Sequence, residues 1–210
     1  MTRFKHIDEL LSEYAQKRTA IRRRLREFHN MKPEQYFYEL LYCLMTPQSS
    51  AVNAARAQKK FEEADFLRAA VEPEPILFHK EHYIRFHKTK SVWISEMKAQ
   101  FETILAVLLS GISSKEKREW LVKHVKGISY KEATHFLRNI GMNDGLAILD
   151  RHILRNLKYH GVVRSLPKAL TEKKYLSIEK KFQLFAREIN ISTDELDLLF
   201  WSREAGEILK

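Results

Sequence analysis

One tight turn between two amphipathic runs constrains the fold of this chain most. The turn lies in the stretch 126–133, with an amphipathic run at 115–125 before it and another at 131–140 after it. Gly127 is the residue of this stretch that adopts left-handed backbone without steric penalty, so we expect the turn to run from Gly127 to Ser129. The pattern therefore predicts two helices joined by a tight hairpin.

The start of the second helix offers groups that suit nucleic-acid chemistry. The first N–H groups of a helix have no partner inside it, so the main chain at Gly127, Ser129 and Lys131 is a candidate phosphate contact. The helix dipole disfavours a cation at this end, which favours the neutral, nucleophilic amine of Lys131. Asp150 heads a further helical run nineteen positions later (150 − 131). Taken alone, Lys131 is a surface lysine and Asp150 a helix cap; together beside such a turn they suggest a reaction on nucleic acid.

The rest of the chain also has helical patterns. Five prolines and six glycines are too few for an all-β protein of 210 residues, and a hydrophobic content of 44% allows a packed interior. We expect one domain over 1–210, or two small lobes that share a core. Helices are predicted, among others, at 4–29, at 33–45, at 51–63, at 64–71 with an end near Pro73, and at 90–109 as the central buried helix.

Charge and cysteine content narrow the class of protein. The formal net charge is +10 (37 − 27), which fits either an acidic polymer as partner or merely a soluble basic enzyme. One cysteine, Cys43, lies in an apolar run and excludes both an intramolecular disulfide and a four-cysteine iron–sulfur cluster. The basic residues within 17–26 form either a solvated face or an outer contact to a phosphate backbone. The sequence shows no secretory signal and no long apolar span, so we expect a soluble intracellular protein.

The segment 125–155 resembles the helix-hairpin-helix superfamily of DNA glycosylases, in its bifunctional branch. Within this superfamily the chain is most similar to the archaeal-type 8-oxoguanine DNA glycosylase/AP lyase family, on the motif at 126–139 and on the short end after a Trp-bearing helix. The similarity covers about 34–210. The chain departs from the family twice: Ser129 stands where glycine is usual, and the link after the hairpin is one residue longer, at Gly145.

The resemblance implies an all-α fold of two helical lobes with the active-site cleft between them. The helix-hairpin-helix motif would span about 114–141, followed by a catalytic-aspartate loop at 142–155. The implied function is base-excision repair, in which 8-oxoguanine is flipped out of duplex DNA and removed through a Schiff base with Lys131, and the strand is nicked by β-elimination. Asp150 would stabilise the oxocarbenium-like sugar and help Lys131 to lose its proton.

The resemblance also implies the partners of the protein. The expected partner is double-stranded DNA containing 8-oxoguanine, bound by a monomer on the chromosome in the cytoplasm, without membrane contact. No cofactor, iron–sulfur cluster or resident metal is expected; a structural monovalent cation at the hairpin would bind only together with DNA. Two alternatives stay open: a related glycosylase for another damaged base, and a non-catalytic helix-hairpin-helix DNA-binding module. Lys131 together with Asp150 argues against the module, which needs neither group.

The expected base pocket rests on the same resemblance. Phe86 and Trp201 correspond to an aromatic pair that sandwiches the oxidised base. The terminal carboxylate of Lys210 would accept a hydrogen bond from N7–H, a donor that normal guanine lacks. Asp197, one turn before Trp201, is a further candidate. By periodicity alone, Phe86 and Trp201 are core aromatics and Lys210 is a frayed tail.

The remaining candidates contact DNA. By resemblance, Gln48 would enter the gap that the flipped nucleotide leaves, and His152 would face the phosphate of the lesion. Arg138 and Arg155 are further phosphate candidates. The simpler alternatives are a glutamine that closes a loop and a surface histidine. The stretch 78–88 alternates basic and aromatic residues, which is typical either of a base-stacking loop or of an ordinary connector.

Overall fold

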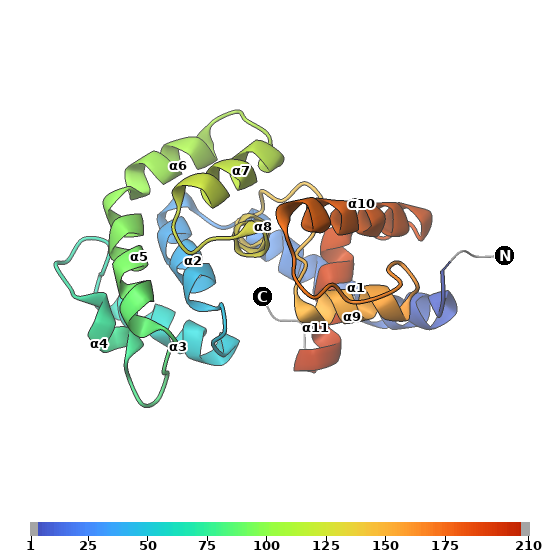
Figure 1. Ribbon diagram of the computed structural model, residues 1–210, viewed down its shortest axis with the longest axis horizontal. Helices are drawn as coiled ribbons and strands as arrows, with labels where there is room; N and C mark the ends of the chain where they lie inside the picture. The colour runs from blue at the N-terminus through green and yellow to red at the C-terminus, as the bar shows by residue number, and fades with distance from the viewer. Residues whose placement is uncertain (1–3, 207–210) are drawn as a thin grey trace. The chain divides into compact units, whose positions relative to one another are not determined.

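The computed structural model describes residues 4–206, and over this range it is entirely helical, with no β-strand (Figure 1). The predicted all-α class is confirmed. The helices are α1 Ile7–His29, α2 Pro33–Met45, α3 Ala51–Glu63, α4 Pro73–Leu77, α5 His87–Ala99, α6 Phe101–Leu109, α7 Ser114–His124, α8 Tyr130–Asn139, α9 Arg151–Tyr159, α10 Glu172–Glu188 and α11 Thr193–Ala205.

The chain forms two compact units, in agreement with the two predicted lobes. The first unit combines the chain up to Asn30 with the chain from Gly141 onward, and it contains α1, α9, α10 and α11. The second unit is Met31–Ile140 and contains α2 to α8. One continuous segment is thus inserted between the two parts of the first unit.

The first unit is assembled around α11, which contacts α1, α9 and α10. Its start follows from local sequence: Ser192 caps the helix by accepting from the Glu195 N–H, and Glu195 accepts in return from the Ser192 N–H at 3.1 Å. This capping box satisfies N–H groups that a helix start leaves without partners. Buried aromatic residues of α10 and α11, among them Phe182 and Phe200, fill the interior beside it.

The second unit is assembled around α2 and α8. The former contacts α3, α5, α6 and α8, and α8 also contacts α7. Every residue of α8 from Glu132 to Asn139 is buried. The hairpin helix that begins beside Lys131 is therefore a core helix of its unit, which makes its position rigid.

The prediction of one central buried helix at 90–109 is wrong. This segment divides at Gln100 into α5 and α6, because Gln100 leaves the helical backbone region with φ −104° and ψ 9°. Both helices bury one face only, and Val92 and Leu109 are exposed. The apolar positions that suggested a central helix form a single stripe, which is the pattern of a surface helix.

The prediction of a helix at 64–71 is also wrong. The chain leaves α3 through Asp65, whose left-handed φ of 43° stops helical propagation, and continues as turns. The next helix, α4, begins at Pro73. Proline suits the first helical position, where no N–H bond is needed, so this proline starts a helix where we expected one to end.

Candidate active site and DNA contacts

The hairpin forms where the sequence predicts it, between α7 and α8. Gly127 has φ +83°, a left-handed conformation that favours glycine. A Cβ at this position would also lie only 2.3 Å from Cε3 of Trp93 in α5. The turn therefore requires glycine at position 127 for two reasons: the backbone conformation is left-handed, and the indole ring of Trp93 leaves no room for a Cβ.

Ser129, which stands where the resemblance predicts glycine, caps α8. Its hydroxyl donates to Oε2 of Glu132, and its N–H lies 3.3 Å from the same oxygen. This reciprocal contact is a capping box. The main-chain N–H of Ser129, predicted to face a phosphate, is thus already used within the protein, and the structure does not support that contact.

Lys131 projects from the first turn of α8. Its side chain is 23% exposed, and Nζ lies 3.6 Å from Oε1 of Glu132. The two oxygens of Glu132 therefore divide their contacts: Oε2 completes the cap with Ser129, and Oε1 faces the amine. A buried carboxylate fixed in this way orients Lys131, whose side chain stays partly exposed.

Asp150 is the N-cap of α9, as predicted. Its Oδ1 accepts from the N–H groups of His152 and Ile153, each at 2.8 Å. Oδ2 has no hydrogen-bond partner within the described part of the chain. One oxygen is thus used for the fold, and the other is available to a substrate. Asp150 belongs to the first unit and Lys131 to the second.

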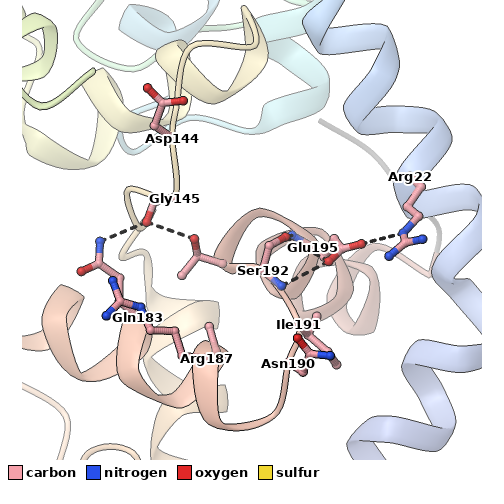
Figure 2. A pocket seen from close by; sticks show the side chains of 11 residues that line it. Arg22, Asp144, Gly145, Gln183, Arg187, Asn190, Ile191, Ser192 and Glu195 are labelled. Carbon is pink, nitrogen blue, oxygen red and sulfur yellow. Dashed lines mark hydrogen bonds and ion pairs between the residues drawn. The ribbon is translucent and has the colours of Figure 1, made fainter. Parts of the chain in front are cut away.

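The link that precedes Asp150, predicted to be one residue longer than in the family, is attached to α10 and α11. Gly145 adopts φ +76°, and its carbonyl accepts from Nε2 of Gln183 and from Oγ1 of Thr193, both at 3.0 Å (Figure 2). These residues line a pocket together with Arg22, Asp144, Ala186, Arg187, Asn190, Ile191, Ser192 and Glu195. No predicted catalytic or base-binding residue lines this pocket, so it does not match the expected base pocket.

Two further contacts fix the last residues before Asp150. The buried carboxylate of Glu179 accepts from the Ala147 N–H at 2.8 Å. Tyr175 donates to the Ala147 carbonyl at 2.5 Å and accepts from the Leu149 N–H at 3.2 Å. Side chains of α10 and α11 therefore fix the link that leads to Asp150.

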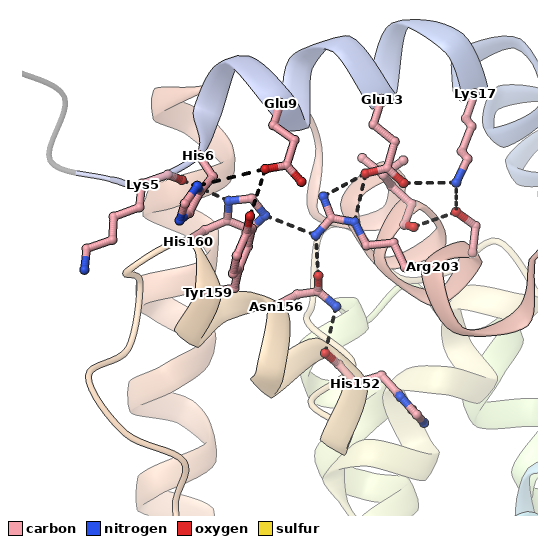
Figure 3. A network of polar contacts seen from close by, with 12 residues as sticks. Lys5, His6, Glu9, Glu13, Lys17, His152, Asn156, Tyr159, His160 and Arg203 are labelled. Carbon is pink, nitrogen blue, oxygen red and sulfur yellow. Dashed lines mark hydrogen bonds and ion pairs between the residues drawn. The ribbon is translucent and has the colours of Figure 1, made fainter.

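The other end of α9 is joined to α1 and α11 by a polar network (Figure 3). Arg203 of α11 bonds Glu13 of α1 through Nε at 2.8 Å and Nη2 at 2.7 Å. Its Nη1 donates to Oδ1 of Asn156 at 2.5 Å and to Nε2 of His160 at 3.3 Å. Nε2 of His160 is therefore an acceptor, so Nδ1 carries the hydrogen that it donates to the Lys5 carbonyl at 3.0 Å.

Burial and hydrogen bonds together determine the charge of the groups in this network. Burial lowers the pKa of His160, because an imidazolium there would lose its hydration. For Glu13, burial opposes ionisation, but the hydrogen bonds from Arg203 and Lys17 outweigh it and lower the pKa of the carboxyl. A neutral histidine and an ionised glutamate are the forms that match the donors around them.

Gln48 and Phe86 share an uncommon backbone conformation. Both have left-handed φ values, 57° for Gln48 and 60° for Phe86, and both side chains are exposed. The Phe86 ring, 51% exposed, lies 5.3 Å below the guanidinium of Arg85. The alternative that Phe86 is a core aromatic is wrong. Bulky residues in this conformation store strain, which concentrates at functional sites, so both residues remain candidates for contacts to DNA.

Trp201 lies on α11, where its half-buried ring stacks on the imidazole of His152 at a centroid distance of 5.0 Å. His152 is only 8% exposed, and its Nδ1 lies 3.2 Å from a carboxylate oxygen of Glu204. The structure does not support the predicted phosphate contact of His152, because the ring is covered by Trp201. Asp197 is buried one turn earlier, and Lys210 lies outside the described residues.

The two arginine candidates differ in exposure. Arg155 is exposed on α9 and remains available to a phosphate. Arg138 is 2% exposed on α8. A guanidinium inside the core cannot reach a DNA backbone at the surface, so the structure does not support the predicted contact of Arg138. A long charged side chain can occupy either a buried or an exposed position of a helix, so the sequence alone does not tell which of the two Arg138 occupies.

The structural roles of two residues, Glu132 and Lys90, were not predicted from the sequence. The spacing of Ser129 and Glu132 is that of a capping box, which was a usable signal. Lys90, a buried lysine of α5, had no comparable signal. Within residues 4–206, no group of three or more His, Cys, Asp or Glu side chains is placed to hold a metal ion. None of the helices in this range has both the length and the apolar composition for a membrane crossing.

Comparison with known proteins identifies the family. The model of the 8-oxoguanine DNA glycosylase family matches residues 21–191. The chain is 38% identical to an 8-oxoguanine DNA glycosylase/AP lyase of Fusobacterium nucleatum and 36% identical to one of Methanocaldococcus jannaschii, over the full length of each pair. The crystal structure of the Methanocaldococcus jannaschii 8-oxoguanine DNA glycosylase matches with a TM-score of 0.83 at 33% identity, covering 97% of this chain and 95% of that chain.

A crystal structure of the Methanocaldococcus jannaschii 8-oxoguanine glycosylase/lyase in complex with a 15mer DNA containing 8-oxoguanine also matches. Its TM-score is 0.84 at 33% identity, covering 96% of this chain and all of that chain. The match to the family model and the full-length matches to these relatives lead to the same assignment. This chain belongs to the 8-oxoguanine DNA glycosylase family.

Proposed function

We propose that this protein is a bifunctional 8-oxoguanine DNA glycosylase/AP lyase of base-excision repair. The observation that supports this most directly is the start of α8, where a partly exposed lysine amine follows a glycine turn in a chain of this family. A lysine at this position gives the enzyme a nucleophile, which a purely hydrolytic glycosylase or a DNA-binding module does not need.

The proposed reaction begins with the neutral amine of Lys131. The amine attacks C1′ of the flipped nucleotide, the glycosidic bond breaks, and the base leaves with the bonding electron pair and takes up a proton. The sugar ring opens to give a Schiff base between C1′ and Nζ. Loss of a proton from C2′ then expels the 3′ phosphate by β-elimination, and water releases the lysine.

Asp150 would act on charge and protons in this sequence. Its Oδ2 stabilises the positive charge that develops at C1′ and O4′, and it accepts a proton from the ammonium of Lys131. Support comes from the division of its two oxygens, since only Oδ1 is used by the helix cap. The mechanism requires both residues at one sugar.

The proposed base pocket uses Phe86 and Trp201 as stacking surfaces, Asp197 as a further lining residue and the terminal carboxylate of Lys210 as acceptor for N7–H. The DNA contacts would include Gln48, the hairpin at Gly127 and Arg155. The exposure of Phe86 supports the first assignment. We propose further that the protein acts as a monomer on chromosomal DNA in the cytoplasm and needs no cofactor, with a monovalent cation at the hairpin only when DNA is bound.

A cleavage assay on duplexes that each carry one defined lesion tests this function. We expect excision and a β-elimination nick at 8-oxoguanine, and little reaction with undamaged guanine or with other damaged bases. Preferred cleavage of a different lesion would identify a related glycosylase. Binding without any cleavage of the lesion panel or of abasic sites would identify a binding module and reject the proposal.

Appending residues after Lys210 tests base recognition separately. The extension moves the carboxylate away from the base, so excision of 8-oxoguanine should fall about tenfold to a hundredfold, the loss expected for one charged hydrogen bond. Cleavage of an abasic site, which has no base to recognise, should change much less. Equal losses on both substrates would show that the extension blocks DNA access, and no loss on either would exclude the carboxylate from recognition.

A further inference from the structure

Lys90 of α5 is a buried lysine that the proposed chemistry does not use. Its side chain is 2% exposed. Nζ donates to the carbonyls of Met45 at 2.6 Å and Pro47 at 2.8 Å, and it lies 3.4 Å from Oγ of Ser49. These acceptors belong to the end of α2 and to the loop that follows it, where helix carbonyls lack partners inside the helix. Lys90 is thus a side-chain cap for the end of α2.

The same loop carries Gln48 in its left-handed conformation. Lys90 binds the residues on both sides of Gln48, namely Pro47 and Ser49. The main chain of Lys90 also forms a hydrogen bond, because its N–H donates to the carbonyl of Phe86 at 2.9 Å. One residue therefore contacts the immediate surroundings of both exposed, left-handed side chains.

A further hydrogen bond connects the two segments directly. The N–H of Arg85, the residue before Phe86, donates to Oγ of Ser49 at 3.0 Å. Ser49 thus accepts from the segment of Phe86 and faces the amine of Lys90. Lys90, Ser49 and Arg85 form a compact link that sets where Gln48 and Phe86 stand relative to each other within the second unit.

We propose that Lys90 is the positioning residue of nucleotide flipping: it holds the Gln48 loop and the start of α5 so that Gln48 enters the duplex while Phe86 receives the base. This inference rests on the proposed function, because it assigns those two roles to Gln48 and Phe86. Lys90 itself touches neither DNA nor the reacting atoms. Its effect is on the opening of a duplex and on base reading, not on the chemistry at C1′.

The protonation state of Lys90 sets the number of contacts that it makes. Three acceptors need three donors, which an ammonium has, whereas a neutral amine has two. Burial lowers the pKa of Lys90 to about 8; Glu132 of α8 opposes this shift, and Arg85 adds to it. As the pH rises through about 8, the amine therefore loses one donor, and the hold on the loop weakens.

Two substrates separate this role from general stability. The first is a duplex with 8-oxoguanine, which requires flipping and base reading. The second is a single-stranded oligonucleotide with an abasic site, which requires only the Schiff-base chemistry of Lys131. The ratio of the two single-turnover rates cancels the titration of the nucleophile itself. In the wild type, this ratio should fall as the pH rises from about 7 to 9, with its midpoint near the pKa of Lys90.

Substitution gives an independent test with a matched control on the same helix. Lys90→Met keeps an unbranched chain and removes all donors, so it should lower duplex excision about tenfold or more and leave single-stranded cleavage nearly unchanged. It should also abolish the pH dependence of the ratio. The control is Lys98→Met: Nζ of Lys98 donates to the Ala69 carbonyl at 2.6 Å, away from the Gln48 loop, so this variant should behave as the wild type.

Several outcomes would overturn the inference. It fails if the wild-type ratio is flat across this pH range, if Lys90→Met and Lys98→Met lose equally, or if Lys90→Met lowers both rates alike. A misfolded Lys90→Met protein leaves the wild-type pH series as the decisive measurement.

A wild type that cleaves no lesion duplex would instead reject the proposed function. In that case, binding to a duplex with an abasic analogue, compared with an intact duplex, still tests Lys90. The wild type should prefer the interrupted duplex and Lys90→Met should not. A shared preference, or none in either protein, would overturn the role of Lys90.

Discussion

The first turns of α8 and α9 each combine a helix cap with a proposed reactive group, but they do so with different residues. In α8 the tasks are divided, since Ser129 and Oε2 of Glu132 form the cap, and Lys131, whose amine faces Oε1 of Glu132, takes no part in it. In α9 one residue performs both tasks, because Asp150 caps through Oδ1 and keeps only Oδ2 for chemistry. Stability and reactivity are therefore separable at α8 and coupled at α9.

The largest expected loss of activity is at the start of α8, where the cap and the proposed nucleophile are different residues. Lys131→Gln should abolish base excision and the adduct that borohydride traps between protein and lesion DNA, because no nucleophilic amine remains at this position. DNA binding and the melting temperature should stay close to the wild type, since the cap of α8 is intact. Trapping yields, DNA affinity and thermal denaturation are the measurements. An adduct of equal yield from the variant would mean that another amine is the nucleophile.

At the start of α9, two substitutions of Asp150 distinguish its role as a helix cap from its proposed role in catalysis. Asparagine caps a helix about as well as aspartate, so Asp150→Asn should stay folded while single-turnover excision falls by about 10²–10⁴-fold. Asp150→Ala should lose the same activity and also destabilise the protein by about 1 kcal/mol. Single-turnover rates and urea unfolding separate these effects. If Asp150→Asn excises at a near-normal rate, Asp150 is only a cap.

Ser129→Ala should show the reverse pattern. It removes the hydroxyl that contacts Glu132, so we expect a loss of about 1 kcal/mol in the free energy of unfolding with only a small change in excision. Ser129→Gly is the control and should lose only a few tenths of a kcal/mol, as glycine is tolerated at caps. A large loss of activity without destabilisation would show that the cap also positions Lys131 through Glu132.

The smallest effect concerns the far end of α9. The pKa of His160 lies below its usual 6.5 because of burial, so the unfolded state binds a proton more readily than the folded state. The free energy of unfolding should therefore decrease as the pH falls below about 6.5. Burial also lowers the pKa of His82 in the second unit. Accordingly, His160→Gln should flatten only part of the decline in urea titrations, whereas Lys131→Gln should follow the wild type. A wild-type profile that is flat between pH 7 and 5 would contradict the assignment of a neutral His160.

Local features of the site could be predicted from the sequence, because their causes are local. The left-handed glycine of the hairpin and the Asp150 cap each depend on a few neighbouring residues. Burial could not be predicted in the same way. The sequence predicts His152 and Arg138 at the DNA surface, yet Trp201 of α11 stacks on His152, and Arg138 is buried on α8, which packs against α2.

Lys90 shows the same limit most clearly. Its acceptors, at Met45 and Pro47, are 45 and 43 residues away in the chain. No periodicity reports that a lysine will be enclosed by carbonyls from another helix, since an exposed lysine gives the same pattern. The family resemblance implied residues that touch the substrate, whereas residues that support them required a structure.

The split connectivity of the first unit has a consequence for biosynthesis. Tyr14 and Arg22 of α1 bond Glu195, 181 and 173 residues later, and Glu13 bonds Arg203 after 190 residues. On a translating ribosome, α1 emerges well before its partners in α11, and the continuous second unit can fold in between. Until α11 is made, α1 must remain soluble with its apolar face uncovered. Because like charges repel one another, the basic residues within 17–26 of α1 favour the solubility of the chain until Glu195 has been made.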